Sequence, residues 1–324
     1  MTSTNVKHFM YKRVFFYISS DVVLLDLAGI VQVFEECSFF DVVYEMHFVG
    51  SFSDVRSTSG LMIGALENFE NYIPGSDDII FVPGRGMKNF HIKEYDSFFC
   101  WLKQANSRKT TICSVCTGAF LLAHCGLLNG RKCTTHWRFT KKLQEQFPLI
   151  KVEENKVFVK DENIYTSAGV TTGIDLALSL IEENHDPETA INVAKEIVVY
   201  MRRNGDEEQE SPYLKYRDHH DQTVHKVQNW IISNIGNKMF INDIALIANC
   251  SPRNLTRVFK IHTGVTVSQY INSVRIEKAT RMLLNTGFKF EYIAKLCGYH
   301  DTKQLRHILR KNLNDEVLDS ANII

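Results

Sequence analysis

The sequence predicts two domains of different class: an α/β sandwich with a mostly parallel sheet, followed by an all-α domain with two helix–turn–helix units. Three observations support this prediction. Segments with strand-like and helix-like apolar spacing alternate through roughly the first two-thirds of the chain. A polar stretch rich in helix breakers follows at residues 204–212. Beyond residue 221 the apolar periods are helical, and one helix–turn–helix pattern occurs twice.

The N-terminal domain is expected to place short buried strands between helices. The strands are expected at residues 14–18, 46–49, 79–82 and 110–115. Helices are expected at residues 27–37 and 95–105, from residue 118 onward, and from Asp186-Pro187 to about residue 203. This alternation is typical of a parallel sheet covered by helices on both faces.

The expected domain boundaries are residues 1–203, a linker at 204–220, and residues 221–324. The composition is that of an ordinary globular protein, and the formal net charge is zero. Residues 221–313, however, contain 14 Lys and Arg against 5 Asp and Glu. Residues 1–220 contain 23 against 29. A basic C-terminal third indicates a polyanionic partner, although a helical surface can also be basic by chance.

The C-terminal helices are expected at residues 224–235, 241–248 and 266–284 around the two motifs. Ser251-Pro252 forms an N-cap followed by proline at the first helical position, and Asn249 is expected in a left-handed conformation. The long helix at 266–284 spans roughly 28 Å, close to the ~34 Å between successive major grooves on one face of DNA. One DNA-binding helix–turn–helix unit, called a head below, at each end of this helix would fit that spacing.

The second helix of each motif is expected to turn apolar residues inward and polar residues toward double-stranded DNA. The inward set is Leu255, Val258 and Phe259 in the first copy, and Leu305, Ile308 and Leu309 in the second. The DNA-binding set is Ser251, Arg253, Asn254, Arg257, Lys260, Thr302, Lys303, Arg306, His307 and Arg310. Arginine can pair with guanine and asparagine with adenine, but the sequence does not separate base contacts from phosphate contacts.

A candidate ligand site surrounds Cys116, which lies where a buried strand turns sharply into a helix. This arrangement is typical of a nucleophile elbow, and a helix N-terminus favours the thiolate. Gly84 and Arg85 follow a neighbouring strand and could supply N–H donors to an anion. Asp26 could hydrogen-bond Cys116, or it could simply cap the helix that begins at Leu27.

His136 is the histidine expected nearest this pocket. It is a second candidate base or a packed residue with one structural hydrogen bond. The eight cysteines lack the spacing of a disulfide framework or a zinc site, and we expect neither a metal nor a cofactor. The apolar run at 14–34 is interrupted by Asp21 and Asp26, so no membrane span is expected. We therefore expect a cytoplasmic protein whose cysteines are mostly reduced.

The C-terminal region resembles the AraC/XylS family of regulators through Ser-Pro-Arg-x-Leu-x-Arg-x-Phe-Lys at 251–260 and Ile-Ala-x-x-Cys-Gly-Tyr at 293–299. Leu305 and Leu309 stand where that family usually has phenylalanine. An acidic segment at 314–319 replaces the Gly-x-(Ser/Thr)-Pro ending that is usual in that family. We therefore expect weaker or less base-specific DNA binding by the second helix–turn–helix unit.

The N-terminal motifs at 114–123, 126–131, 134–137 and 166–177 resemble the PfpI/ThiJ, class I glutamine amidotransferase-like fold, a flavodoxin-like sandwich. Together the two halves resemble the GlxA-type transcription regulators. That resemblance implies a homodimer whose first domain senses a small metabolite, thought here to be nitrogen-containing or a carboxylate. The signal is expected to pass through the helix at 187–203 and the linker.

Two alternatives remain open at this point. Isonitrile hydratases of the same superfamily share Asp, Cys-Thr and Thr-x-His-Trp at corresponding places, so Asp26, Cys116 and Thr117 could support a thiol-dependent hydratase or amidase. Thr117, however, stands where the protease-like members carry histidine. The second alternative is a DNA-binding protein whose sensor is vestigial. We expect a regulator rather than an enzyme.

Overall fold

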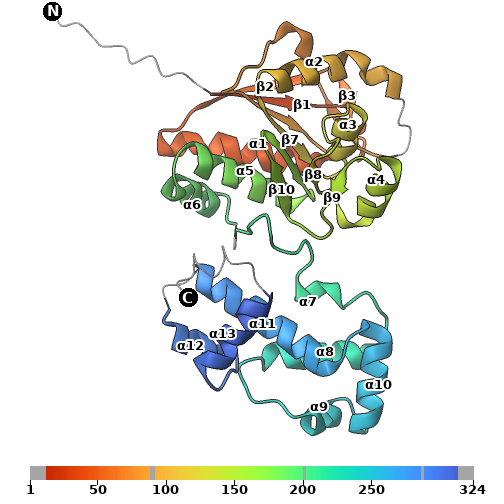
Figure 1. Ribbon diagram of the computed structural model, residues 1–324, viewed down its shortest axis with the longest axis vertical. Helices are drawn as coiled ribbons and strands as arrows, with labels where there is room; N and C mark the ends of the chain where they lie inside the picture. Colours follow the sequence, from red (N-terminus) through yellow and green to blue (C-terminus); the bar gives the residue numbers. More distant parts are fainter. Residues whose placement is uncertain (1–11, 88–91, 200–201, 286–287, 313–324) are drawn as a thin grey trace, which may run out of the picture. The chain divides into compact units, whose positions relative to one another are not determined.

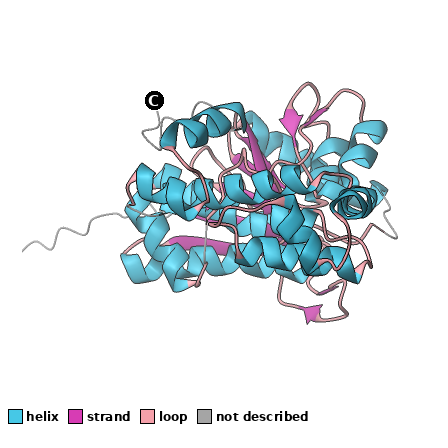
Figure 2. Ribbon diagram, turned by 90° about the horizontal axis from the view of Figure 1, so that it is seen from below, coloured by secondary structure: helices cyan, strands magenta, loops and turns pink. Residues whose placement is uncertain are grey.

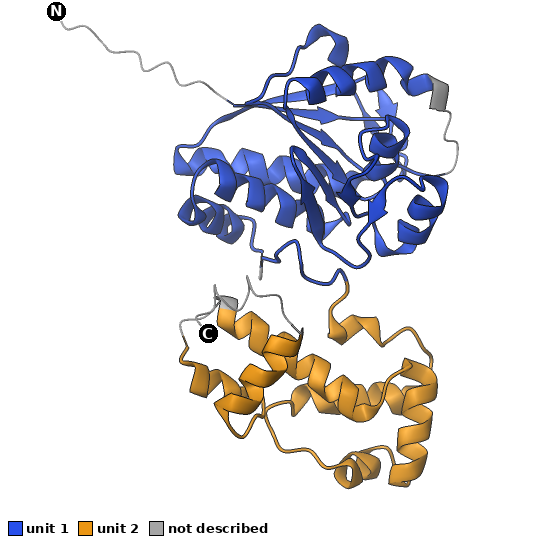
Figure 3. Cartoon of the chain, viewed as in Figure 1, with its two compact units in different colours: residues 1–209 blue, residues 210–324 orange. Residues whose placement is uncertain are grey.

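The structure is a computed structural model that describes residues 12–87, 92–199, 202–285 and 288–312. The chain forms two compact units, residues 1–209 and residues 210–324 (Figure 3). Within the described residues, strands occur in the first unit and the second is helical. Figure 2 distinguishes the helices from the strands by colour. No described helix is both long and apolar enough to cross a lipid bilayer.

The first unit is built on a seven-stranded sheet with the order β10-β11-β7-β6-β1-β2-β5. Its pairs are parallel except β10 with β11. The strands are β1 (Lys12–Tyr17), β2 (Tyr44–Gly50), β5 (Glu67–Asn68), β6 (Ile79–Val82), β7 (Thr111–Val115), β10 (Phe158–Asp161) and β11 (Ile164–Ser167). Two small sheets join β3 (Val55–Arg56) to β4 (Met62–Ile63) and β8 (Lys132–Cys133) to β9 (Lys151–Val152).

Helices cover both faces of the sheet, as the alternation predicts. One layer contains α1 (Leu24–Glu36), α5 (Thr171–Asn184) and α6 (Pro187–Glu196) (Figure 1). The other contains α2 (Asp96–Ser107), α3 (Gly118–His124) and α4 (Thr140–Gln146). Short 3₁₀ turns lie at Cys37–Phe40, Phe69–Asn71, Ile92–Tyr95 and Trp137–Phe139. The predicted α/β sandwich is therefore confirmed.

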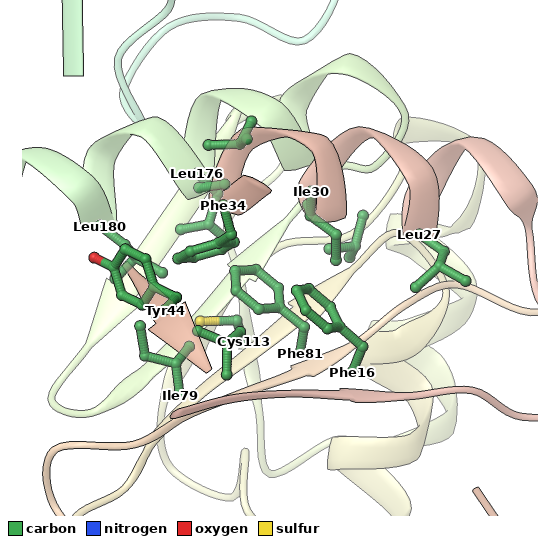
Figure 4. Packing of buried hydrophobic residues seen from close by; sticks show 14 of the residues in the cluster. Phe16, Leu27, Ile30, Phe34, Tyr44, Ile79, Phe81, Cys113, Leu176 and Leu180 are labelled. Carbon is green, nitrogen blue, oxygen red and sulfur yellow. The ribbon is translucent and has the colours of Figure 1, made fainter. Parts of the chain in front are cut away.

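Each layer packs on its own buried apolar cluster. Beneath α1 and α5, aromatic side chains of the sheet point toward the two helices (Figure 4). Phe16 and Phe81 stack with ring centroids 5.8 Å apart, and Phe34 of α1 meets Phe81 edge-on at 5.6 Å. These rings fix α1 against the strands, and α1 carries Asp26 into the candidate site.

The last helix of this unit is shorter than predicted. α6 ends at Glu196 instead of running to about residue 203. Val198 adopts a left-handed conformation, with φ 55°, and the Val199 N–H turns back to the Ala194 carbonyl. The helical hydrogen-bond pattern therefore stops several residues before Arg203.

The second unit contains α7 (Pro212–Lys215), α8 (Gln222–Ser233), α9 (Ile241–Ile247), α10 (Pro252–Thr263), α11 (Val267–Asn285), α12 (Phe290–Leu296) and α13 (Thr302–Asn312). α9 with α10 and α12 with α13 are the two helix–turn–helix pairs. As predicted, Ser251 caps α10 through the Asn254 N–H, Pro252 follows, and Asn249 has φ 50°. The acidic residues 314–319 lie outside the described residues.

Candidate ligand site and nucleic-acid interface

Cys116 occupies the sharp turn between β7 and α3 that the sequence predicts. Its φ is +54°, a left-handed conformation that costs a non-glycine residue on the order of 1–3 kcal/mol. The Cys116 N–H donates to the Ser167 carbonyl at 3.0 Å, and Thr135 Oγ1 donates to the Cys116 carbonyl at 2.7 Å. Hydrogen bonds from two directions thus hold the strained residue in place.

Asp26 lies beside this turn, and its side chain is completely buried. The helix α1 already begins at Leu24, so the interpretation of Asp26 as a cap before Leu27 is wrong. Its Oδ1 instead accepts a hydrogen bond of 2.6 Å from the Val170 N–H, at the start of α5. Burial raises the Asp26 pKa, while the Val170 N–H, the Cys116 thiol and the Gly84 N–H lower it.

The thiol of Cys116 is a protonated group at neutral pH. Burial raises its pKa to about 12, the negative charge of Asp26 adds to the rise, and the Thr117 N–H and hydroxyl oppose it. Burial therefore opposes the thiolate that the helix N-terminus is expected to favour. α3 is only seven residues long, and the Cys116 side chain is only 7% exposed.

Arg85 and Thr117 bind each other instead of leaving donors free for an anion. The Arg85 N–H donates to Thr117 Oγ1 at 2.8 Å, and Thr117 Oγ1 donates to the Arg85 carbonyl at 2.7 Å. The Arg85 side chain is buried, with its guanidinium 5.5 Å from the Tyr95 ring centroid and 4.0 Å from the Asp21 carboxylate. The Arg85 N–H is therefore already used within the protein.

Two glycines allow the site to close around Cys116. A Cβ on Gly84 would lie 2.2 Å from Asp26 Oδ2 and 3.0 Å from Cys116 Cβ. A Cβ on Gly169, whose φ is +98°, would lie 2.3 Å from Cys116 Cβ. Asp26 Oδ2 is thus enclosed by Gly84 and Cys116, whose backbone N–H and thiol lower the Asp26 pKa.

His136 does not hydrogen-bond Cys116 among the described contacts. Its Nδ1 accepts from the Arg138 N–H at 3.3 Å, and its ring lies 5.4 Å from the Trp137 ring. Burial and the Arg138 charge lower the His136 pKa, so the ring is neutral near pH 7. Within the described residues, no group of three or more His, Cys, Asp or Glu side chains could hold a metal ion.

The structure adds residues to this site that the sequence interpretation missed. Thr135 donates a hydrogen bond to the Cys116 carbonyl. The Val170 N–H donates one to the Asp26 carboxylate. Gln209 lies one step further out, with its Nε2 donating to the Thr135 carbonyl at 2.9 Å. Thr135, Gly169 and Val170 lie in motifs that the sequence analysis noticed, but only the three-dimensional structure brings them to Cys116.

The two recognition helices turn their predicted faces outward. Leu255, Phe259, Leu305 and Leu309 are buried. The predicted DNA-binding residues are exposed, except Thr302, which is half-buried. Arg257 donates to Asn254 Oδ1 at 3.0 Å, and the Arg306 guanidinium lies 5.2 Å from the Phe290 ring centroid. Each helix thus presents a cationic and amide-bearing surface opposite its buried leucine.

One outward residue of α13 was overlooked in the sequence. Gln304 is exposed, and it corresponds to Asn254 when Leu305 is aligned with Leu255. Its N–H donates to the Asp301 carboxylate at 2.7 Å, as the Asn254 N–H does to Ser251 Oγ. The internal repeat was the signal that could have identified Gln304, because equivalent caps place equivalent residues outward.

The geometry agrees with comparisons to known proteins. The model of the DJ-1/PfpI family matches residues 12–183, and a helix-turn-helix domain model matches residues 244–315. The chain belongs to the DJ-1/PfpI family. It joins this DJ-1/PfpI domain to an AraC-type helix–turn–helix domain, so the predicted resemblance to GlxA-type regulators is confirmed.

Relatives of this DJ-1/PfpI protein include regulators and an enzyme. It is 26% identical over 258 residues to the HTH-type transcriptional regulator GbdR of Pseudomonas aeruginosa, covering 79% of this chain and 69% of GbdR. It is 25% identical over 186 residues to the regulator GlxA of Rhizobium meliloti, covering 57% of each chain. It is 34% identical over 182 residues to isonitrile hydratase of Pseudomonas putida, covering 56% of this chain and 75% of the enzyme.

A prediction follows from the Asp26–Cys116 pair. Asp26→Asn removes the carboxylate charge that raises the Cys116 pKa, so the thiolate fraction should increase. We expect alkylation of Cys116 by iodoacetamide at pH 8.5 to become roughly two- to tenfold faster. The rate is measured by mass spectrometry of the peptide that contains Cys116. Asp41→Asn, at an exposed carboxylate, is the matched control. An unchanged rate in Asp26→Asn would show that the two groups are not coupled.

Proposed function

We propose that the protein is a cytoplasmic transcription regulator that binds DNA through α10 and α13 and a small molecule beside Cys116. The observation that carries the DNA-binding part is the outward polar face of both recognition helices. Each face is rich in arginine, lysine and amide groups, and each is held by a buried leucine or phenylalanine on the opposite side. The excess of basic residues in this unit provides attraction to phosphate.

Ser251, Arg253, Asn254, Arg257 and Lys260 form the proposed first reading surface. Thr302, Lys303, Gln304, Arg306, His307 and Arg310 form the second. Arg257 and Asn254 are linked by a hydrogen bond, which restricts both side chains before DNA binds. A restricted pair of this kind suits recognition of bases better than a flexible lysine does.

The proposed effector site is the buried pair Asp26–Cys116 with Thr117, Gly84, Arg85 and His136 around it. Two properties support binding of a ligand here rather than a purely structural role. The strained backbone of Cys116 and Val170, with φ 54° and 55°, converges on one carboxylate. That carboxylate is buried, and beside the Val170 N–H its neighbours are the Cys116 thiol and the Gly84 N–H. A small metabolite with an N–H donor would compete with these groups for the Asp26 carboxylate.

We infer that the signal leaves this site through residues 203–209, the last part of the first unit. Arg203 is hydrogen-bonded to α5. Its backbone N–H and its Nε each donate to the buried Asp175 carboxylate at 2.9 Å. Its Nη2 donates to Thr171 Oγ1 at 2.7 Å. Val170, the residue before Thr171, is the one that binds Asp26. One end of the segment is thus tied to one wall of the site.

The other end of this segment is tied to the opposite wall. Gln209 Nε2 donates to the carbonyls of Thr135 and Lys156 at 2.9 and 3.0 Å, and its Oε1 accepts from the Trp137 N–H at 2.7 Å. Thr135 in turn holds the Cys116 carbonyl. The next residue, Glu210, begins the second unit. A ligand that displaces either wall would therefore release or tighten the chain segment that leads to the DNA-binding unit.

We further propose that two copies of the chain associate through an apolar surface on α1 and the β3–β4 hairpin. Leu25, Leu61 and Met62 are more than half exposed there. A groove of about 460 Å³ lies beside them, lined mainly by α1, β2 and residues 63–66. Exposed apolar residues and an apolar groove on the same elements favour a protein interface, and a second copy would bury them symmetrically. Sedimentation equilibrium giving the mass of one chain would contradict this.

A second candidate function is a thiol-dependent hydratase, which the isonitrile hydratase relative favours. The protonated state of Cys116 argues against a nucleophilic thiolate at neutral pH. We therefore expect no hydration of an alkyl isonitrile above the rate in buffer alone, measured as formation of the N-alkyl formamide by mass spectrometry. Turnover that disappears in Cys116→Ala would overturn the assignment of this domain as a sensor without catalytic activity.

The DNA-binding assignment predicts a specific loss in Arg257→Ala. We expect its affinity for the DNA upstream of the protein's own gene to fall by about 1–3 kcal/mol, because a restrained guanidinium contact to a base is removed. Fluorescence anisotropy against a scrambled duplex measures the loss. Lys226→Ala removes an exposed charge from α8 and is the matched control. Equal losses on both duplexes would assign Arg257 to phosphate instead.

The coupling route predicts the behaviour of Gln209→Ala. Removing the amide frees the Trp137 N–H from its acceptor, so hydrogen–deuterium exchange in the peptide spanning residues 134–139 should accelerate. The affinity of the full chain for DNA should also change. Gln146→Ala, at an exposed glutamine at the end of α4, should alter neither quantity. Exchange and affinity that both match the unmodified protein would contradict this route.

A further inference from the structure

The second unit contains two separate apolar cores that share a single helix. α11 contributes Val267, Tyr270 and Val274 to the core of the first helix–turn–helix pair. Further along, it contributes Ala279 to the core of the second pair, with Met282 and Leu283 packed against it. α11 therefore links the two cores, and contacts between the two halves beside it also set the angle of the second core to the first.

Arg275 lies on α11 between these two cores. Its Nη2 donates to the Asn237 carbonyl at 2.8 Å, and its Nε donates to the Ile235 carbonyl at 3.3 Å. Both carbonyls belong to the segment that follows α8, in the first half of the unit. The same guanidinium lies 5.7 Å from the ring centroid of Tyr299, which is buried in the turn of the second pair. One side chain therefore contacts both halves.

The backbones of the two halves approach each other closely at this point. A Cβ on Gly298, whose φ is +75°, would lie 2.6 Å from Arg275 Nη2 and 2.7 Å from the Ile235 carbonyl oxygen. A Cβ on Gly236 would lie 2.9 Å from the Leu296 carbonyl oxygen. Only glycine at both positions allows so close an approach. Lys278, one turn along α11, donates to the same Leu296 carbonyl at 2.8 Å.

The chemistry of Arg275 suits a rigid connection. Among the described residues it forms no salt bridge, and its hydrogen-bond partners are backbone carbonyls, which cannot change rotamer. Its planar guanidinium presents donors in a fixed fork, so two carbonyls and one ring define its orientation. Desolvation lowers the Arg275 pKa, while Tyr299 and Cys297 favour the charged form. The side chain remains charged at neutral pH, because an arginine pKa is so high.

We propose that Arg275 is a positioning residue that fixes the angle between the two helix–turn–helix pairs and thereby the spacing of α10 and α13 on DNA. This inference rests on the proposed DNA binding by both helices. It goes beyond it because Arg275 lies on α11, outside both recognition helices. When the two heads are held at the spacing of their sites, binding of the first raises the effective concentration of the second at the DNA. Loosely joined heads lose part of this gain in affinity.

The direct test measures the spacing without DNA. Nitroxide labels are placed on α10 and α13 through Thr256→Cys and Gln304→Cys, two exposed positions, in the full chain with Cys100→Ser and Cys250→Ser. Double electron–electron resonance then gives the distance distribution. We expect a single narrow distribution, broadened about twofold or shifted in Arg275→Ala and also in Arg275→Lys, which keeps the charge but not the fork. Distributions identical to that of Lys226→Ala would overturn the proposal.

A second measurement separates positioning from folding and from charge. We expect Arg275→Ala to weaken binding to a 30-base-pair duplex, long enough for both heads, by roughly tenfold or more relative to Lys226→Ala. Binding to a 12-base-pair duplex, which accommodates one head, should match that of Lys226→Ala. Equal weakening on both lengths would overturn the proposal in favour of a general loss of charge or fold. If neither the unmodified protein nor any variant bound either duplex, the proposed DNA-binding function would be contradicted. The distance measurement, which uses no DNA, would still test whether Arg275 fixes the angle between the two pairs.

Discussion

The hydrogen bond between the buried Asp26 carboxylate and the Val170 N–H organises the site in the first unit. It joins α1 to the start of α5 at a distance of 2.6 Å, on residues 144 apart in sequence. A carboxyl group without water must be satisfied by the protein, so the neighbouring backbone is arranged around it. Gly84 and Gly169 give the space, and Cys116 and Val170 accept left-handed backbone conformations. The unusual features of the site therefore have one common cause.

That constraint also explains why the site is connected to the end of the unit. The segments beside Cys116 also hold residues 203–209, through Thr171 and Asp175 of α5 on one side and Thr135 on the other. The second unit uses a comparable arrangement, since Arg275 binds two backbone carbonyls of the first half and lies beside the Tyr299 ring of the second half. In both units, polar side chains that hydrogen-bond to the backbone fix the position of one element relative to its neighbour.

Local signals were sufficient for much of the fold. The strand–turn–helix at Cys116 and the caps at Ser251 and Asn249 depend on neighbours in sequence, and the structure shows each as predicted. Of the two alternatives for Asp26, only the helix cap is wrong, and its partner Val170 could not be predicted because it is distant in sequence. The Cys116 thiolate was expected from a local dipole, but burial by the surrounding layers determines the pKa. The early end of α6 reflects a left-handed Val198 that no sequence signal marks.

The proposed function requires α10 and α13 of this DJ-1/PfpI protein to read DNA sequence together, on one face of the double helix. This is tested by incubating the full chain with sheared genomic DNA from its source organism and sequencing the bound fragments. Recognition by both helices should enrich fragments that share a two-part site, with half-sites about 10 base pairs apart. Bound fragments with the same composition as the input would contradict it.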